Sequence, residues 1–250
     1  EENISWKKLR ENVFKISYFL KELGLSKNDR IAGYVPNTIE TVISFLSTAK
    51  NGYIWSSCSP DFGIQGVVDR FKQIEPKVLF TCDYYFYNGK KINIIDRVPQ
   101  ILKEIPSIKK VIVFSYNKTE ETNHDYDRFE EILKKSNKDD KFDRFEFNHP
   151  VYILYSSGTT GVPKCIVHGA GNALIEQKKE LSIHCDVKEG DRVFYFTTTG
   201  WMMWNWQVAA LSCGASIYLY DGSPFYPSID ILIQYCSKNQ FTLFGVGAKY

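Results

Sequence analysis

The sequence predicts an α/β fold in which mostly parallel sheets are covered by helices. Short apolar runs alternate with helix-like stretches along the 250 residues, which is the pattern of βαβ units. The apolar runs are continuous rather than alternating, as expected for strands that are buried on both faces. A hydrophobic content of 44% is sufficient for a sizeable core.

The first predicted element is an amphipathic helix that begins after Ser5 and ends at Gly24. Ser5 is a suitable N-cap, and Gly24 can end the helix in the left-handed conformation. Apolar residues follow one another at steps of three and four, which places them on one face: Leu9, Val13, Ile16, Leu20 and Leu23.

Strands and helices then follow in turn. Apolar runs predict strands at 30–35, 53–56, 77–81, 111–114, 151–155, 192–196, 216–220 and 242–244. Helical periodicity predicts helices at about 38–50, 64–74, 129–135, 172–183 and 229–238. The stretch 117–148 is rich in Lys, Asp, Glu and Asn. We therefore expect a solvated insertion there, with one helix inside it.

Charge and cysteine content narrow the class of protein. A net charge of +2, from 31 basic and 29 acidic residues, argues against a nucleic-acid partner. The six cysteines are scattered without a CxxC pair, which indicates buried thiols in a reducing compartment. No run of 18 apolar residues occurs, and the charged start EENISWKKLRENV is unlike a signal peptide. We therefore expect a cytoplasmic protein without a membrane span.

The stretch YSSGTTGVPK, residues 155–164, directly follows a predicted strand. It is not the P-loop of NTPases, because Gly158 and Gly161 are three residues apart and Lys164 comes after Val-Pro. It nevertheless holds the groups that bind phosphate: glycines that let the backbone approach, a cation, and four hydroxyls. Those hydroxyls belong to Ser156, Ser157, Thr159 and Thr160. The alternative interpretation is a flexible surface turn.

This stretch resembles the phosphate loop of the acyl-adenylate-forming enzymes, which include acyl-CoA synthetases, luciferases and adenylation domains. Cys165 stands where that family usually has Gly. Five further segments narrow the resemblance to members that activate acetoacetate: IWSSCSPDFG (54–63), KCIVHGAG (164–171), GWMMWNW (200–206), LYDGSP (219–224) and GAKY (247–250). On this resemblance residues 1–250 are a partial N-terminal AMP-binding domain. The adenine-site motifs and the mobile C-terminal domain of the family would lie outside it.

The resemblance implies that the full-length enzyme joins acetoacetate to CoA through an acyl-adenylate, with release of AMP and pyrophosphate, in fatty-acid and ketone-body metabolism. It implies ATP, CoA and Mg²⁺ as cofactors, although no carboxylate in the chain can be named as a metal ligand. The phosphates of ATP would be bound by Ser156, Ser157, Gly158, Thr159, Thr160, Gly161 and Lys164. Another short-chain acyl-CoA synthetase, such as acetyl-CoA synthetase, and a non-catalytic nucleotide-binding fragment are the alternatives.

The resemblance also implies an acyl and CoA pocket lined by Gly200, Trp201, Trp204, Gly247, Ala248 and Lys249. Trp201 and Trp204 would share one face of a helix, and core packing is the competing interpretation for both. A turn with two cations would bind the CoA 3′-phosphate, unless it is only a solvated loop: Asn88, Gly89, Lys90 and Lys91.

A metal site is not expected. His168 lies three residues after Cys165, but the other histidines supply no pattern of further ligands, which favours a structural role for His168. Among the cysteines, Cys165 beside the loop is the one to test for reactivity.

Overall fold

The computed structural model describes residues 1–117, 124–137, 141–156, 161–248 and 250, and it confirms the predicted α/β fold. Seven strands form the main sheet: β1 (Arg30–Tyr34), β2 (Ile54–Cys58), β3 (Val78–Cys82), β6 (Lys110–Phe114), β7 (Asp127–Arg128), β8 (Pro150–Ser156) and β9 (Lys164–Gly169). Their order in space is β7-β6-β3-β1-β2-β8-β9, and every neighbouring pair is parallel except β8 and β9.

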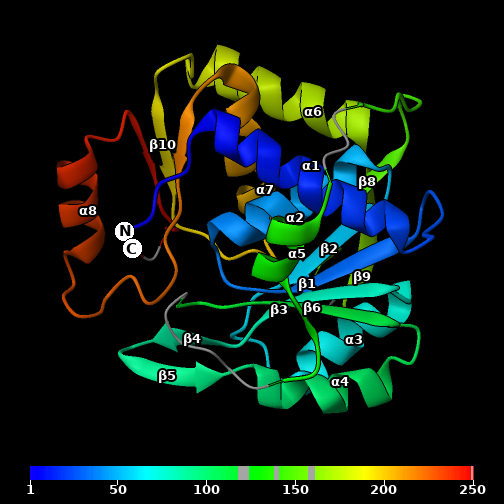
Figure 1. Cartoon of the computed structure of the whole chain (residues 1–250). Helices are drawn as coiled ribbons and strands as arrows, with labels where there is room; N and C mark the ends of the chain where they lie inside the picture. Colours follow the sequence, from blue (N-terminus) through cyan, green and yellow to red (C-terminus); the bar gives the residue numbers. More distant parts are fainter. Residues whose placement is uncertain (118–123, 138–140, 157–160, 249) are drawn as a thin grey trace.

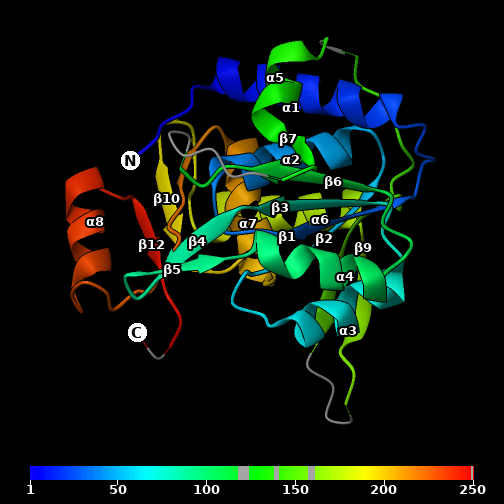
Figure 2. The same ribbon diagram turned by 60° about the horizontal axis from the view of Figure 1, so that its bottom comes forward.

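Helices cover both faces of this sheet, as Figures 1 and 2 show. Three lie on one face: α1 (Trp6–Glu22), α2 (Ile39–Lys50) and α5 (Phe129–Lys135). Two lie on the other face: α3 (Ile64–Ile74) and α4 (Val98–Glu104), the latter preceded by a 3-10 turn at Ile95–Arg97. The central strands are therefore shielded from water on both sides, which explains their continuous apolar sequences.

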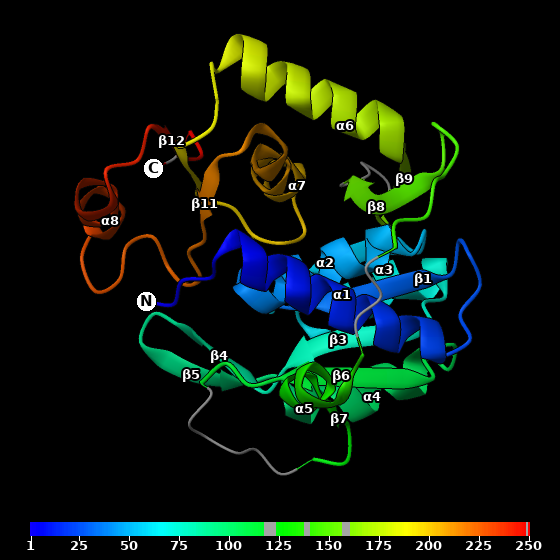
Figure 3. The same cartoon turned by 45° about the horizontal axis from the view of Figure 1, so that its top comes forward.

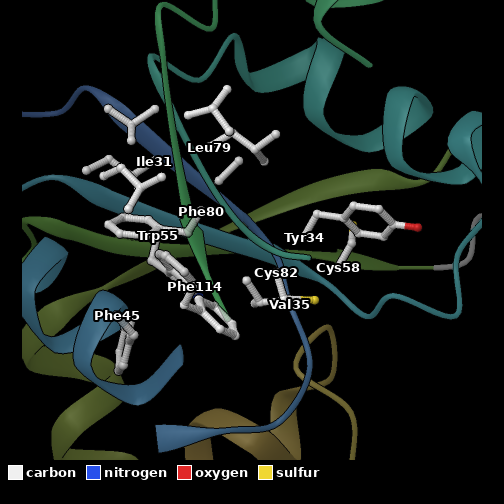
Figure 4. Close-up of a cluster of buried hydrophobic side chains, with 14 of the residues drawn as sticks. Ile31, Tyr34, Val35, Phe45, Trp55, Cys58, Leu79, Phe80, Cys82 and Phe114 are labelled. Carbon is white, nitrogen blue, oxygen red and sulfur yellow. The ribbon is translucent and has the colours of Figure 1, made fainter. Parts of the chain in front are cut away.

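The core of the main sheet is aromatic. Trp55 of β2 lies between Phe45 of α2 and Phe80 of β3, with ring centroids 6.3 Å and 6.2 Å apart (Figure 4). Trp55 and Phe80 are almost fully buried. Pairs of this kind add stability beyond the apolar area that they bury.

A second sheet consists of three short parallel strands in the order β11-β10-β12. They are β10 (Arg192–Tyr195), β11 (Ser216–Tyr218) and β12 (Leu243–Gly245). The helices around it are α6 (Ala170–Lys179), which continues as a π turn over Glu180–His184, α7 (Met202–Ala209), which continues as a 3-10 turn over Ala210–Cys213, and α8 (Ile231–Asn239). Figures 1 and 3 show α7 on one side of this sheet and α8 on the other.

An antiparallel hairpin, β4 (Tyr84–Tyr87) and β5 (Lys90–Asn93), projects from the end of β3 toward the second sheet (Figures 1 and 2). Its two turn residues, Asn88 and Gly89, have positive φ angles of 49° and 72°. Glycine fits this turn, because a Cβ on Gly89 would also collide with the hydroxyl of Tyr226.

Most predicted elements occur within a few residues of their expected ends. Strand β9, helix α4 and the β4–β5 hairpin were not among the predicted elements. The stretch 117–148 is not wholly solvated. Its helix α5 has the predicted bounds, but Phe129 at its start is buried against Phe80 and Phe114. Strand β7 in the same stretch pairs with β6 and extends the main sheet.

Candidate functional site

The carboxyl ends of the parallel strands of the main sheet meet the end of strand β10. Thr199, in the segment that follows β10, donates from Oγ1 to the Val35 carbonyl at 2.9 Å. Ser57 of β2 donates from Oγ to the Thr199 carbonyl at 2.7 Å. Crevices at the carboxyl edge of parallel sheets are the usual ligand sites of open α/β folds. This edge is therefore where a substrate site is expected.

The predicted phosphate loop connects β8 to β9 at this edge. Ser156 ends β8 and lies opposite Lys164, the first residue of β9, in the antiparallel register. Lys164 is exposed, and Gly161 has a φ of +113°, which favours glycine. Four loop residues predicted to bind phosphate lie outside the described residues: Ser157, Gly158, Thr159 and Thr160. The hairpin thus places the lysine cation directly across from the start of the loop.

Helix α3 and strand β2 support the base of this hairpin. Gln73 of α3 donates from Nε2 to the Pro163 carbonyl at 2.8 Å and accepts from the Cys165 thiol at 3.6 Å. Ser56 of β2 lies with its Oγ 3.1 Å from the hydroxyl of Tyr155, the residue before the loop. Both ends of the loop are therefore anchored to the main sheet and its helices.

Neither Cys165 nor His168 has the environment of a reactive or metal-binding group. Burial raises the pKa of the Cys165 thiol, whereas an activated thiol needs a lowered pKa. His168 packs its ring against Tyr152, with ring centroids 4.9 Å apart, and burial lowers its pKa. Within the described parts of the chain, no group of three or more His, Cys, Asp or Glu side chains could hold a metal ion.

The two tryptophans predicted to share a helix face point to different surroundings. Trp201 precedes α7 as its N-cap and is 64% exposed, whereas Trp204 is fully buried and donates from Nε1 to Asn37 Oδ1 at 2.9 Å. The shared-face prediction is wrong because the helix begins one residue after Trp201. Core packing describes Trp204, and only Trp201 lies open to a ligand. Gly200 packs against β2, since a Cβ there would lie 3.4 Å from the Ser57 carbonyl.

The remaining predicted residues lie on two other segments. Gly247 and Ala248 follow β12 and are exposed, and Lys249 lies outside the described residues. Asn88, Gly89 and Lys90 form the tip of the β4–β5 hairpin, which Figures 1 and 3 place away from β8 and β9. Lys91 is adjacent, with its Nζ 3.7 Å from the ring centroid of Tyr84. The hairpin tip and Lys164 of β9 therefore place positive charge in two separate regions.

One polar cluster at the same edge was missed from the sequence. Asp221, after β11, accepts a hydrogen bond from the backbone N–H of Asn37 at 3.2 Å and another from the Tyr116 hydroxyl at 3.2 Å. Burial raises the pKa of the Asp221 carboxyl to about 6. The segment LYDGSP marks this position in the sequence, but nothing in it identifies partners more than 100 residues away.

No helix in the described residues is both long and apolar enough to cross a membrane.

Comparison with known proteins adds to this geometry. A family model described as "AMP-binding enzyme" matches residues 1–247. The chain is 44% identical to acetoacetyl-coenzyme A synthetase of Rhizobium meliloti (strain 1021) and 43% identical to acetoacetyl-CoA synthetase of Gallus gallus. Each of these alignments covers 99% of this chain and 38% of the relative. The solved structure of acetoacetyl-CoA synthetase from Streptomyces lividans matches all of this chain and 38% of that one, with a TM-score of 0.94 and 41% identity.

Proposed function

The chain belongs to the AMP-binding enzyme family, and on this premise we propose that it is the phosphate-loop part of an acetoacetate–CoA ligase. In the full-length enzyme, acetoacetate and ATP form an acyl-adenylate with release of pyrophosphate. The thiol of CoA then displaces AMP. The chain spans 38% of the length of the relatives it matches. We therefore propose this activity for the full-length enzyme and not for the 250-residue chain alone.

The observation that carries the proposal is sequence identity to acetoacetyl-CoA synthetases, which is 44% and 43% over 99% of this chain. The Streptomyces lividans structure shares the fold at a TM-score of 0.94, and its identity of 41% is high enough to compare more than the fold. The structure supports the proposal with a glycine-containing loop at the carboxyl edge of the sheet and Lys164 across from its start.

The phosphate loop would act by electrostatic stabilisation. Negative charge moves onto the pyrophosphate as it leaves, and donors that are already in place stabilise that charge without reorganisation. Lys164 supplies a point charge, and Gly161 lets the backbone approach the phosphates. The proposed phosphate ligands are Ser156, Ser157, Gly158, Thr159, Thr160, Gly161 and Lys164.

Mg²⁺ would enter this site together with ATP. The described residues offer no cluster of three or more metal-binding side chains, so they do not form a cage for the ion. This fits the behaviour of Mg²⁺, which is commonly held by substrate phosphates with few protein ligands. The ion would neutralise phosphate charge, and the chain's own contribution is the loop and its lysine.

The acyl group and CoA would bind at the neighbouring segments. Trp201, exposed beside the junction of the two sheets, would form a wall of the acyl pocket, together with Gly200 and the residues after β12: Gly247, Ala248 and Lys249. The tip of the β4–β5 hairpin would bind the 3′-phosphate of CoA through Asn88, Gly89, Lys90 and Lys91. We also place the protein in the cytoplasm.

The test is ATP–pyrophosphate exchange by the full-length protein with four acids in parallel. Acetoacetate is expected to support exchange with a higher kcat/KM than acetate, propionate or butyrate. A preference for acetate would favour an acetyl-CoA synthetase, and exchange with none of the four acids would refute the proposal.

The 250-residue chain itself gives a second test. We expect it to show little or no exchange activity, because it spans little more than a third of its relatives' length. Calorimetry with ATP and with CoA then measures binding alone. Heat with ATP but no activity is the expected result, whereas a scaffold module should give heat with neither. Robust turnover by this chain would contradict the expectation.

A further inference from the structure

Three residues far apart in the sequence form one polar cluster between the two sheets. Asn37 follows β1, Tyr116 follows β6, and Asp221 follows β11. The two carboxylate oxygens of Asp221 accept separate hydrogen bonds, Oδ1 from the Asn37 N–H and Oδ2 from the Tyr116 hydroxyl, each at 3.2 Å. One side chain that follows a strand of the second sheet therefore contacts residues that follow two strands of the main sheet.

Asn37 extends this cluster to helix α7. Its side chain is buried, accepts from Trp204 Nε1 at 2.9 Å and donates from Nδ2 to the Tyr220 carbonyl at 3.4 Å. Trp204 lies three residues after Trp201 and is the third residue of α7, the helix that Trp201 precedes as its N-cap. Asp221 is thus connected through Asn37 to the start of α7.

The segment before Trp201 is fixed from a second direction. Thr199 donates to the Val35 carbonyl and accepts at its own carbonyl from Ser57, so that two strands of the main sheet hold it. A small chamber of about 20 Å³ adjoins this contact and is lined by groups that include Thr197, Asp61 and Asp221. It is large enough for about one water molecule.

Burial disfavours the charged form of Asp221, and its two hydrogen bonds offset only part of that cost. The titratable groups that act on it or respond to it are Asp61 after β2, Cys82 at the end of β3, Tyr116 after β6 and the adjacent Tyr220. All four are acidic or neutral groups. A buried carboxylate is tolerated when its oxygens are hydrogen-bonded, and here the Asn37 and Tyr116 donors supply those bonds.

We propose that Asp221 is a positioning residue for the ligase reaction, and that it acts through Asn37 to hold Trp201 and the start of α7 against the carboxyl edge of the main sheet. The inference rests on the proposed function, because that function makes the relative placement of Trp201 and the phosphate loop matter. Misplacement of a substrate-binding group by about 1 Å can cost about 100-fold in rate. The role of Asp221 is to set this placement without contact with substrate.

The first experiment follows hydrogen bonds directly by NMR of the 250-residue chain between pH 5 and pH 8. The resonances of the Asn37 backbone N–H and of the Trp204 indole N–H are expected to shift together as Asp221 ionises, with a midpoint near pH 6. In Asp221→Asn, both resonances should stay constant over this range. The inference is overturned if neither resonance titrates in the wild type, or if both still titrate in Asp221→Asn.

Two further variants sharpen this experiment. Tyr116→Phe removes a hydrogen bond that lowers the pKa of Asp221, so the midpoint should move to higher pH. Asp186→Asn is the matched control, because Asp186 lies before β10 of the second sheet and its side chain is 84% exposed. Its titration curves should overlay those of the wild type. A midpoint that moves down in Tyr116→Phe contradicts the assignment.

The second experiment measures ATP–pyrophosphate exchange in the full-length enzyme. Asp221→Asn is expected to lower kcat by about 10-fold or more, with KM for ATP changed by less than about threefold, because the phosphate loop itself is intact. Asp186→Asn should match the wild type. Wild-type kinetics in Asp221→Asn would overturn the positioning role even if the NMR titration is present. Absence of exchange in the wild type would refute the proposed function instead, and the NMR result would then stand as a separate test of the contacts.

Discussion

The two sheets of this chain are stabilised in different ways. Strands β2 and β3 of the main sheet are buried along their whole length, and Trp55 of β2 packs against the rings of Phe45 and Phe80. Strands β11 and β12 of the second sheet contain no fully buried residue among those described. The separate core of the second sheet has few buried residues: Leu181, Val187, Val193, Ala210 and Ala215.

This difference indicates which contacts fix the second sheet against the main sheet. Large apolar side chains remain exposed on the helices around it, for example Ile183 at 74% and Ile233 at 53%. One buried aromatic residue, Trp204, joins it to the main core, where its ring lies 5.6 Å from that of Phe45. A hydrogen bond that Thr199 donates to the Val35 carbonyl and one that Asp221 accepts from the Asn37 N–H complete the junction. Extensive apolar burial therefore stabilises the main sheet, whereas the second sheet is joined to it by Trp204, by Val208 and by a few polar contacts.

The largest effect should come from removing Trp204. Trp204→Ala leaves a cavity in the junction and a buried Asn37 oxygen without its donor, so we expect a loss of about 3–5 kcal/mol in the free energy of unfolding. Trp201→Ala is the matched variant, since it deletes the same side chain from an exposed position, and should cost about 0.5 kcal/mol or less. Chemical denaturation measures both. Equal losses would contradict the different roles of the two residues.

Trp204→Phe separates packing from hydrogen bonding. It retains most of the ring but removes the N–H that Asn37 accepts, and we expect a loss of about 1–3 kcal/mol. A loss near zero would show that the polar contact contributes little.

The pH dependence of stability gives the next effect. The pKa of Asp221 is about 6 in the folded chain and near 3.8 in the unfolded chain, so the folded state binds the proton more tightly. This contribution therefore favours folding at low pH and is lost as pH rises through 6. A difference of about two pKa units corresponds to about 3 kcal/mol. Asp221→Asn should be more stable than the wild type at pH 7.5, by up to this amount.

Parallel denaturation of Asp221→Asn and the wild type at several pH values tests this expectation. The difference between them should decrease steadily below pH 6 and be small near pH 4. A wild type that is more stable than Asp221→Asn at pH 7.5 would contradict the predicted sign.

The smallest effect concerns the contact between the β4–β5 hairpin and the segment after β11. Gly89→Ala introduces a Cβ at positive φ that also collides with Tyr226, whereas Gly24→Ala introduces one at positive φ into open space. Each should lose about 1 kcal/mol through backbone strain. Only Gly89→Ala should also increase hydrogen exchange in residues 222–229. The same exchange in both variants would show that the hairpin does not support this segment.

The main sheet was largely predictable because its signals are local. Its strands are apolar runs with both faces buried, and its helices carry apolar residues at steps of three and four. Strand β9 was missed because its sequence, Lys164–Gly169, mixes Lys, Cys and His and lies at the edge of the sheet, where only pairing with β8 defines it. Trp201 and Trp204 were expected on one face of a helix, but α7 begins at Met202, which leaves Trp201 outside the helix as its N-cap.

The site was predictable only in part, and for a physical reason. The phosphate loop is a contiguous motif, so its residues and their chemistry stand together in the sequence. The cluster around Asp221 depends on contacts across 184 residues to Asn37 and 105 residues to Tyr116. Composition and periodicity depend on residues that are close together in the sequence, so they cannot predict contacts between such distant residues.

The most direct test of the central claim compares two lysine variants of the full-length protein in ATP–pyrophosphate exchange with acetoacetate. Lys164→Ala removes the cation opposite the start of the phosphate loop, and the rate should fall by about 100-fold or more, as when one preorganised group is lost from a transition state. Lys178→Ala removes an exposed cation from α6 and should leave the rate unchanged. Equal activity of the two variants would contradict the claim that this hairpin binds the phosphates of ATP.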